Sequence, residues 1–103
     1  MQYNIHATGL TLTPAIKTVA LEKFGRLERM LGRVDAASSL HIDIELGRTT
    51  HHHHKGKIFR AEVHIPLGKH SVYAAAECEE LYAGIDQCVS AAKRQLEKIK
   101  EKI

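Results

Sequence analysis

Long apolar runs and cysteines are scarce in this 103-residue sequence, and the scarcity limits where the protein works. No apolar stretch approaches the roughly 18 residues of a membrane-spanning helix, so we expect no membrane partner. The first residues lead directly into a strand pattern, without the basic and apolar regions of a secretory signal. Only Cys78 and Cys88 are available for a disulfide. We expect both to be free thiols in a reducing cytoplasm.

Catalytic signatures are also missing. The sequence contains no G-x-S-x-G, H-E-x-x-H, P-loop or G-x-G-x-x-G motif. No local partner would activate either cysteine as a thiolate. Polar side chains on predicted strands, such as Asp43, Glu62 and His64, are explained by strand alternation alone. We therefore expect no enzymatic activity, no cofactor and no small-molecule substrate.

What is present is typical of one folded domain. Apolar residues make up 44% of the chain and charged residues 26%, which is the composition of an ordinary soluble protein rather than of a disordered one. The length supports a single hydrophobic core and is too short for two. No linker or repeat divides the chain. We expect a single domain, residues 1–103, and a monomer.

Four segments alternate apolar and polar residues, which is the pattern of a half-buried β-strand. They span residues 2–7, 40–46, 59–65 and 72–76. In the two middle segments, six polar side chains lie on the face opposite Ile42, Ile44 and Val63. The six are His41, Asp43, Glu45, Arg60, Glu62 and His64.

Two further segments repeat apolar residues at helical spacing. The first runs from Thr13, a good N-cap followed by Pro14, to a predicted stop at Gly32. The second spans residues 81–103. The order β-α-β-β-β-α predicts an α+β fold in which both helices cover one face of a four-stranded sheet, with the first two strands parallel.

Four consecutive histidines, His51 to His54, lie in the predicted hairpin loop of residues 47–56. Structural zinc sites use ligands that converge from separated positions, and a contiguous run in a loop has no such fixed geometry. Neither cysteine is near in sequence. We therefore expect a solvated loop, which gains positive charge as the pH falls, and no metal site.

Basic residues follow the flanks of both predicted helices. The first helix carries Lys23, Arg26, Arg29 and Arg33, and the second carries Lys93, Arg94, Lys98 and Lys100. Around the hairpin loop lie Arg48, Lys55, Lys57 and Arg60. Such rows suit a phosphate backbone. Salt bridges to Glu22, Glu28 and Glu97 on a mixed-charge surface explain the pattern equally well, and the charges alone do not separate the two.

Several motifs resemble one known family. Residues 80–86 (ELYAGID), 93–96 (KRQL) and 98–102 (KIKEK) resemble a stretch of the ribosome hibernation-promoting factors and ribosome-associated inhibitors. Members of that family carry an acidic-Met-Tyr-x-Ala-Ile-Asp segment, then Arg-Gln-Leu and a lysine-rich end. Residues 13–16 (TPAI) and 23–28 (KFGRLE) are similar to the family's first helix, and residues 59–63 (FRAEV) to its third strand. The similarity extends over the whole chain.

The resemblance implies a fold similar to a double-stranded-RNA-binding domain and a function in ribosome hibernation. The implied partner is the small ribosomal subunit, bound through its 16S-type rRNA near the decoding centre, where the protein would block tRNA and mRNA. The family's basic helix positions match Lys23, Arg26, Lys93, Arg94, Lys98 and Lys100, and Tyr82 and Asp86 match its motif. From charge placement we add Arg29, Arg33, Lys55, Lys57 and Arg60. The alternatives are a general structured-RNA-binding module and, with less support, a metal-handling protein that uses the histidine loop.

The sequence departs from the family pattern at two places. Gly84 stands where Ala is common, at a local helix cost of roughly 1 kcal/mol. The chain also stops at Ile103, without the C-terminal domain of long members or the acidic tail of some short ones. We expect a short form, unless the sequence is a fragment of a longer protein.

Replacement of His51 to His54 by serine should leave binding to the small subunit unchanged at neutral pH, because the loop offers no fixed ligand geometry. Co-sedimentation with purified subunits measures this. A large loss of binding that a chelator reproduces in the wild type would instead favour a metal site.

Overall fold

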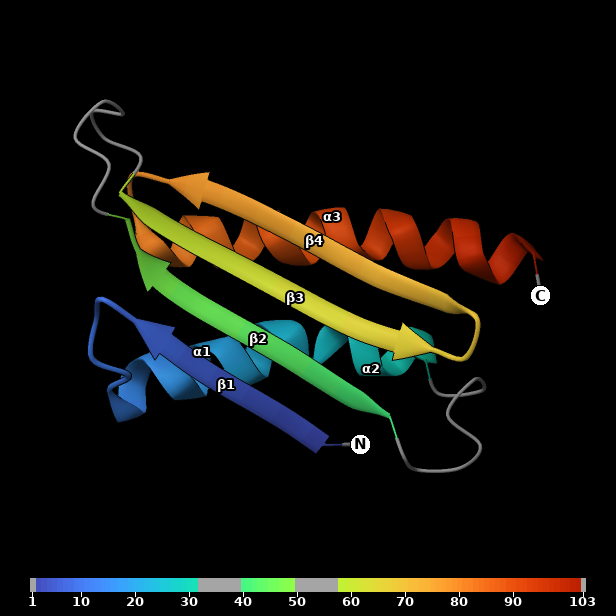
Figure 1. The fold of residues 1–103 in the computed structure, drawn as a ribbon, viewed down its shortest axis with the longest axis horizontal. Coiled ribbons are helices and arrows are strands. Elements are labelled where there is room, and N and C mark those ends of the chain that lie inside the picture. The colour runs from blue at the N-terminus through green and yellow to red at the C-terminus, as the bar shows by residue number, and fades with distance from the viewer. Residues whose placement is uncertain (1, 32–39, 50–57, 103) are drawn as a thin grey trace.

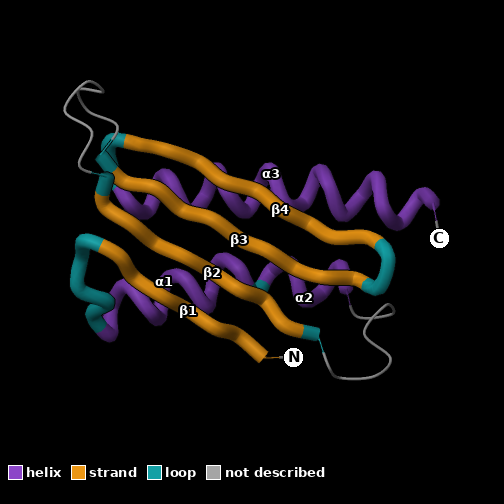
Figure 2. The backbone as a smooth tube through the Cα atoms, viewed as in Figure 1, coloured by secondary structure: helices purple, strands orange, loops and turns teal. Residues whose placement is uncertain are grey.

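Alternating apolar side chains build a mixed sheet of four strands. The computed structural model describes residues 2–31, 40–49 and 58–102 (Figures 1 and 2). The strands are β1 (Gln2–Thr8), β2 (His41–Arg48), β3 (Phe59–Leu67) and β4 (His70–Cys78). They lie side by side in the order β1-β2-β3-β4. The first two are parallel, as predicted, and the remaining pairs are antiparallel.

All helices lie on one face of this sheet. Behind β1 and β2 runs α1 (Pro14–Phe24), behind β2 and β3 lies the short α2 (Arg26–Leu31), and behind β3 and β4 runs α3 (Leu81–Lys102) (Figure 1). The three helices point in the same direction. The predicted α+β fold is therefore confirmed. None of the helices in the described part of the chain is long and apolar enough to cross a membrane.

The hydrophobic core lies between the sheet and the helices. From the strands it receives fully buried side chains such as Ile42, Ile44 and Val63, and from the helices Phe24 and Leu96. The six polar side chains predicted to face outward are exposed or half-buried, and none is buried. The predicted strand register is therefore confirmed, since a shift by one residue would exchange the two sets.

The first helical segment differs from prediction in one respect, because it is divided at Gly25. The Gly25 N–H still donates to the Leu21 carbonyl at 2.9 Å, as in an α-helix. The Glu28 N–H, however, donates to the Gly25 carbonyl at 3.1 Å, three residues back, which is the tighter 3₁₀ pattern. A Cβ at position 25 would lie 2.7 Å from the Leu21 carbonyl oxygen. Glycine therefore permits the tighter turn that separates α1 from α2. The predicted stop at Gly32 lies outside the described residues.

The start of α1 is as predicted. The Thr13 hydroxyl accepts a hydrogen bond from the Ile16 N–H at 3.2 Å, and Pro14 occupies the first turn. Such a cap satisfies one of the backbone donors left free at a helix start.

Tyr3 of β1 lies close to Glu28 of α2. Burial and the neighbouring Glu28 raise the pKa of Tyr3 to about 12. Tyr3 therefore stays neutral at physiological pH and connects β1 with α2.

Two glycines should respond in opposite directions to the same substitution. Gly9 has φ +74°, and a Cβ there would lie 2.9 Å from the Arg48 carbonyl oxygen. Gly9→Ala should therefore destabilise the protein by about 1–3 kcal/mol. A Cβ on Gly84, the fourth residue of α3, would meet only the Cys78 Cβ at 3.6 Å, which is an ordinary contact. Gly84→Ala should stabilise the protein by up to about 1 kcal/mol. Chemical denaturation measures both, and a loss of stability in Gly84→Ala would contradict the packing described here.

Candidate nucleic-acid interface

Two of the predicted cations on α3 lie along the side that faces α1. Lys93 and Lys100 follow Asp86 at seven-residue steps, about two helical turns each, so the three share one side of the helix. The orientation of that side is fixed by Asp86. Its carboxylate contacts the Lys23 ammonium of α1 at 2.7 Å. The side of α3 that carries Lys93 and Lys100 therefore faces α1.

The Lys23–Asp86 ion pair ties the two helices together. The Lys23 side chain is only 21% exposed and that of Asp86 is 55% exposed. Arg26 follows Lys23 by three residues, close to one turn, and is exposed. Four of the predicted cations thus belong to the side where the helices meet. We call them the interhelical cations: Lys23, Arg26, Lys93 and Lys100.

Three other predicted cations are exposed on the helix layer, and the two on α3 lie away from the side that faces α1. Arg94 and Lys98 are four residues apart on α3 and so share one flank of that helix. Arg94 borders a shallow hollow of about 390 Å³ beside Ala75 and Ala76 of β4. Arg29 is exposed on α2. We call Arg29, Arg94 and Lys98 the outer cations. No ion pair with a carboxylate reaches them within the described residues.

Arg60 lies on the opposite, open face of the sheet. Its guanidinium contacts Glu62 at 2.7 Å and Glu77 at 3.2 Å. The hydrogen bond to Glu62 raises the pKa of Arg60, which therefore stays charged. The sheet separates Arg60 from the helix cations, so one flat polyanion cannot contact both. Arg33, Lys55, Lys57 and His51 to His54 lie outside the described residues.

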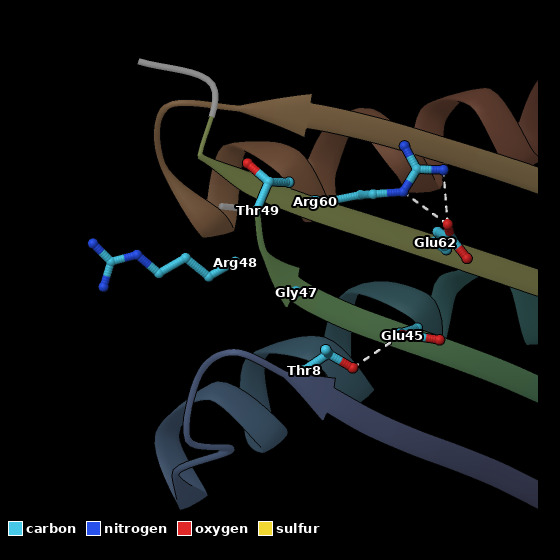
Figure 3. A pocket seen from close by; sticks show the side chains of 7 residues that line it. All are labelled: Thr8, Glu45, Gly47, Arg48, Thr49, Arg60 and Glu62. Carbon is cyan, nitrogen blue, oxygen red and sulfur yellow. Dashed lines mark hydrogen bonds and ion pairs between the residues drawn. The ribbon is translucent and has the colours of Figure 1, made fainter. Parts of the chain in front are cut away.

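The open face has a shallow hollow of about 180 Å³ near the end of β2 (Figure 3). Most of its polar side chains are already paired: Thr8 donates to Glu45 at 3.1 Å, and Arg60 binds Glu62. The Arg48 side chain points away from the others in Figure 3. The lining residues are Thr8, Glu45, Gly47, Arg48, Thr49, Arg60 and Glu62.

The two faces of the protein differ in charge. The open face presents Arg60 together with four carboxylates, from Asp43, Glu45, Glu62 and Glu77. The helices present nine lysines and arginines and five acidic residues. Because phosphate oxygens are attracted to cations and repelled by carboxylates, a nucleic acid is favoured on the helix side.

The sequence interpretation missed the partner of Lys23. Lys23 and Asp86 are each found in a motif of the chain, but their contact joins residues that are distant in sequence. A signal was available, because Asp86, Lys93 and Lys100 repeat every seven residues. That spacing places an acid in the same row as two cations. It could have indicated that the row faces another basic helix.

The two cysteines are free and buried. Burial raises the pKa of the Cys88 thiol to about 12, and the Sγ atom lies 3.5 Å from the Ala74 carbonyl oxygen, to which it donates. The Cys88 thiol is therefore protonated at neutral pH and is not an activated nucleophile. Among the described residues, no group of three or more His, Cys, Asp or Glu side chains is arranged to hold a metal ion.

Comparison with known proteins agrees with this architecture. Residues 3–103 match the model of the family described as sigma 54 modulation protein / S30EA ribosomal protein. The chain belongs to this family. It is also 35% identical, over all 103 residues, to the ribosome hibernation promotion factor of Staphylococcus aureus (strain COL). The chain spans half the length of that relative.

Solved structures share the fold. The N-terminal domain of Protein Y from Thermus thermophilus superposes with a TM-score of 0.74 at 26% identity, covering 96% of this chain and 99% of that domain. A ribosomal subunit interface protein from Coxiella burnetii gives a TM-score of 0.70 at 20% identity, covering 98% and 99% of the two chains. The second likeness supports the fold alone.

The Lys23–Asp86 pair can be measured directly. In a double-mutant cycle of Lys23→Gln and Asp86→Asn, we expect a coupling free energy of about 0.5–1 kcal/mol, because the pair is partly exposed. High salt should reduce it. Urea denaturation of the four proteins supplies the numbers. A coupling of zero at low salt would mean that the ion pair does not hold the helices together.

Proposed function

We propose that this protein binds the small ribosomal subunit through its rRNA, near the decoding centre, and holds the ribosome inactive. The proposed mechanism is steric: the bound domain occupies space that tRNA and mRNA need. Membership of the S30EA family and the name of the Staphylococcus aureus relative support a role in ribosome hibernation. The proposal places the protein in the cytoplasm, acting as a single domain and a monomer.

The observation that carries the proposal is the charge separation between the two faces. Cations from all three helices lie on one layer of the molecule, and the opposite face is rich in carboxylates. Each phosphate that a lysine or arginine neutralises releases counterions, which favours binding without any base being recognised. Backbone contacts of this kind suit a protein that recognises the shape of folded rRNA.

The interhelical and outer cations contribute differently to this proposal. The outer cations are exposed and have no carboxylate partner within the described residues, so they can meet phosphates without losing an existing contact. Lys93 and Lys100 are also available on the interhelical side. Lys23 is already bound to Asp86, so its main contribution is to fix how α1 and α3 present the other cations. Arg60 is not part of this proposed surface.

Charge reversal on α3 tests the surface. Lys93→Glu/Lys100→Glu and Arg94→Glu/Lys98→Glu should each weaken binding to the small subunit at least about tenfold at low salt. Each pair should also flatten the dependence of log K on log salt by about two units if both residues contact phosphates. The side chains lie outside the core, so circular dichroism should show an unchanged fold. Co-sedimentation at several salt concentrations measures both effects.

A matched control carries the same change in net charge elsewhere. Lys17→Glu/Lys69→Glu alters two exposed lysines, one on α1 toward β1 and one in the β3–β4 turn, and should bind almost as the wild type does. Equal loss in this control would mean that only net charge matters. The remaining alternative is a general RNA-binding module, and competition with an excess of tRNA tests it. If tRNA competes as strongly as free small subunits do, the protein is a general RNA-binding module and not a ribosome-specific one.

A further inference from the structure

The two edge strands of the sheet differ in the hydrogen bonds made by their outward backbone groups. At the β4 edge, the side-chain amide of Gln95 on α3 contacts both backbone groups of Tyr73. The Tyr73 N–H donates to Gln95 Oε1 at 2.9 Å, and Gln95 Nε2 donates to the Tyr73 carbonyl at 2.5 Å. This amide imitates a neighbouring strand and closes the edge at that residue. An exposed edge otherwise offers unpaired backbone groups to any extended chain.

The β1 edge has no such closure. The Gln2 N–H donates to the Leu40 carbonyl at 2.9 Å, in the parallel register that pairs Gln2 with His41. Backbone groups alternate in direction along a strand, so the even-numbered residues of β1 face β2. Tyr3, Ile5 and Ala7 consequently direct their N–H and carbonyl groups outward. Within residues 2–31, 40–49 and 58–102, no hydrogen bond reaches these outward groups.

A hollow of about 510 Å³ lies beside this edge, between β1 and α1. Its apolar lining comes from the half-buried side chains of Tyr3, Ile5, Leu12 and Leu21. Lys17 of α1 contributes an exposed ammonium to the same lining. A strand added at this edge would point every second side chain into the hollow.

We propose that the β1 edge is a strand-addition site for an extended polypeptide segment with apolar side chains at alternate positions and one carboxylate opposite Lys17. The backbone ladder to Tyr3, Ile5 and Ala7 provides general affinity, and the hollow selects the side chains. Lys17 favours an acidic segment over a second copy of the chain as the occupant. β1 itself contains no acidic residue, so pairing of two β1 strands would leave both lysines without a partner.

A short synthetic peptide tests the site on the whole protein. The probe is the acetylated and amidated heptapeptide Thr-Val-Thr-Val-Thr-Glu-Thr, titrated into ¹⁵N-labelled protein. The amides of Tyr3, Ile5 and Ala7 should shift, and their hydrogen exchange should slow at least about tenfold in the complex. Shifts confined to the amides of β4, or to the open sheet face, would overturn the proposal.

Two variants sharpen the test. Lys17→Glu should weaken binding of this peptide about two- to fivefold, because one exposed ion pair is lost, and should favour the counterpart peptide in which Lys replaces Glu. Ile5→Pro removes one outward N–H, a change that an edge strand tolerates, and should abolish binding. If Ile5→Pro does not fold, the preference of Lys17→Glu between the two peptides still tests the proposal. An unchanged preference between the two peptides, or a protein dimer that Ile5→Pro dissociates, would contradict the proposed occupant.

Discussion

The packing of one sheet face against three helices is the constraint on which the rest of the structure depends. Side chains such as Ile44, Val63 and Leu96 are almost completely removed from water in this single layer. Since strand side chains alternate, burying one set leaves the other set on the open face. The same packing turns the polar side of each helix outward. One hydrophobic contact therefore exposes both polar surfaces, and the residues at the exposed positions make the open face acidic and the helix layer basic.

This constraint also explains how the cations are divided. α1 and α3 lie side by side, so basic residues on their facing sides have to share space, and Asp86 relieves the repulsion by binding Lys23 at 2.7 Å. The outer cations meet no such crowding. A polyanion approaching the helix layer would find exposed guanidinium groups on α2 and α3 and exposed ammonium groups on α3, at a spacing that the packed helices fix. Rigidity reduces the entropy cost of binding a folded RNA surface.

The fold could be predicted because its signals are local. Strand alternation, the Thr13–Pro14 helix start and the apolar helix spacing each depend on neighbouring residues. The break at Gly25 was missed because the residue keeps a helical conformation, with φ −60° and ψ −21°, and no proline marks it. In the sequence, Gln95 cannot be told from an ordinary polar residue on a helix surface, because its contact with Tyr73 of β4 depends on the tertiary structure. The position of Arg60 was predicted, but its two carboxylate partners, one on a neighbouring strand, were not.

The central claim is that the helix layer, and not the open sheet face, meets rRNA. The most direct measurement is an electron cryo-microscopy structure of this protein bound to the small ribosomal subunit. We expect phosphates near Arg94, Lys98 and Lys100, with Glu62 and Glu77 turned away from the RNA. A complex in which the open sheet face lies against rRNA, and the three helices face solvent, would contradict it.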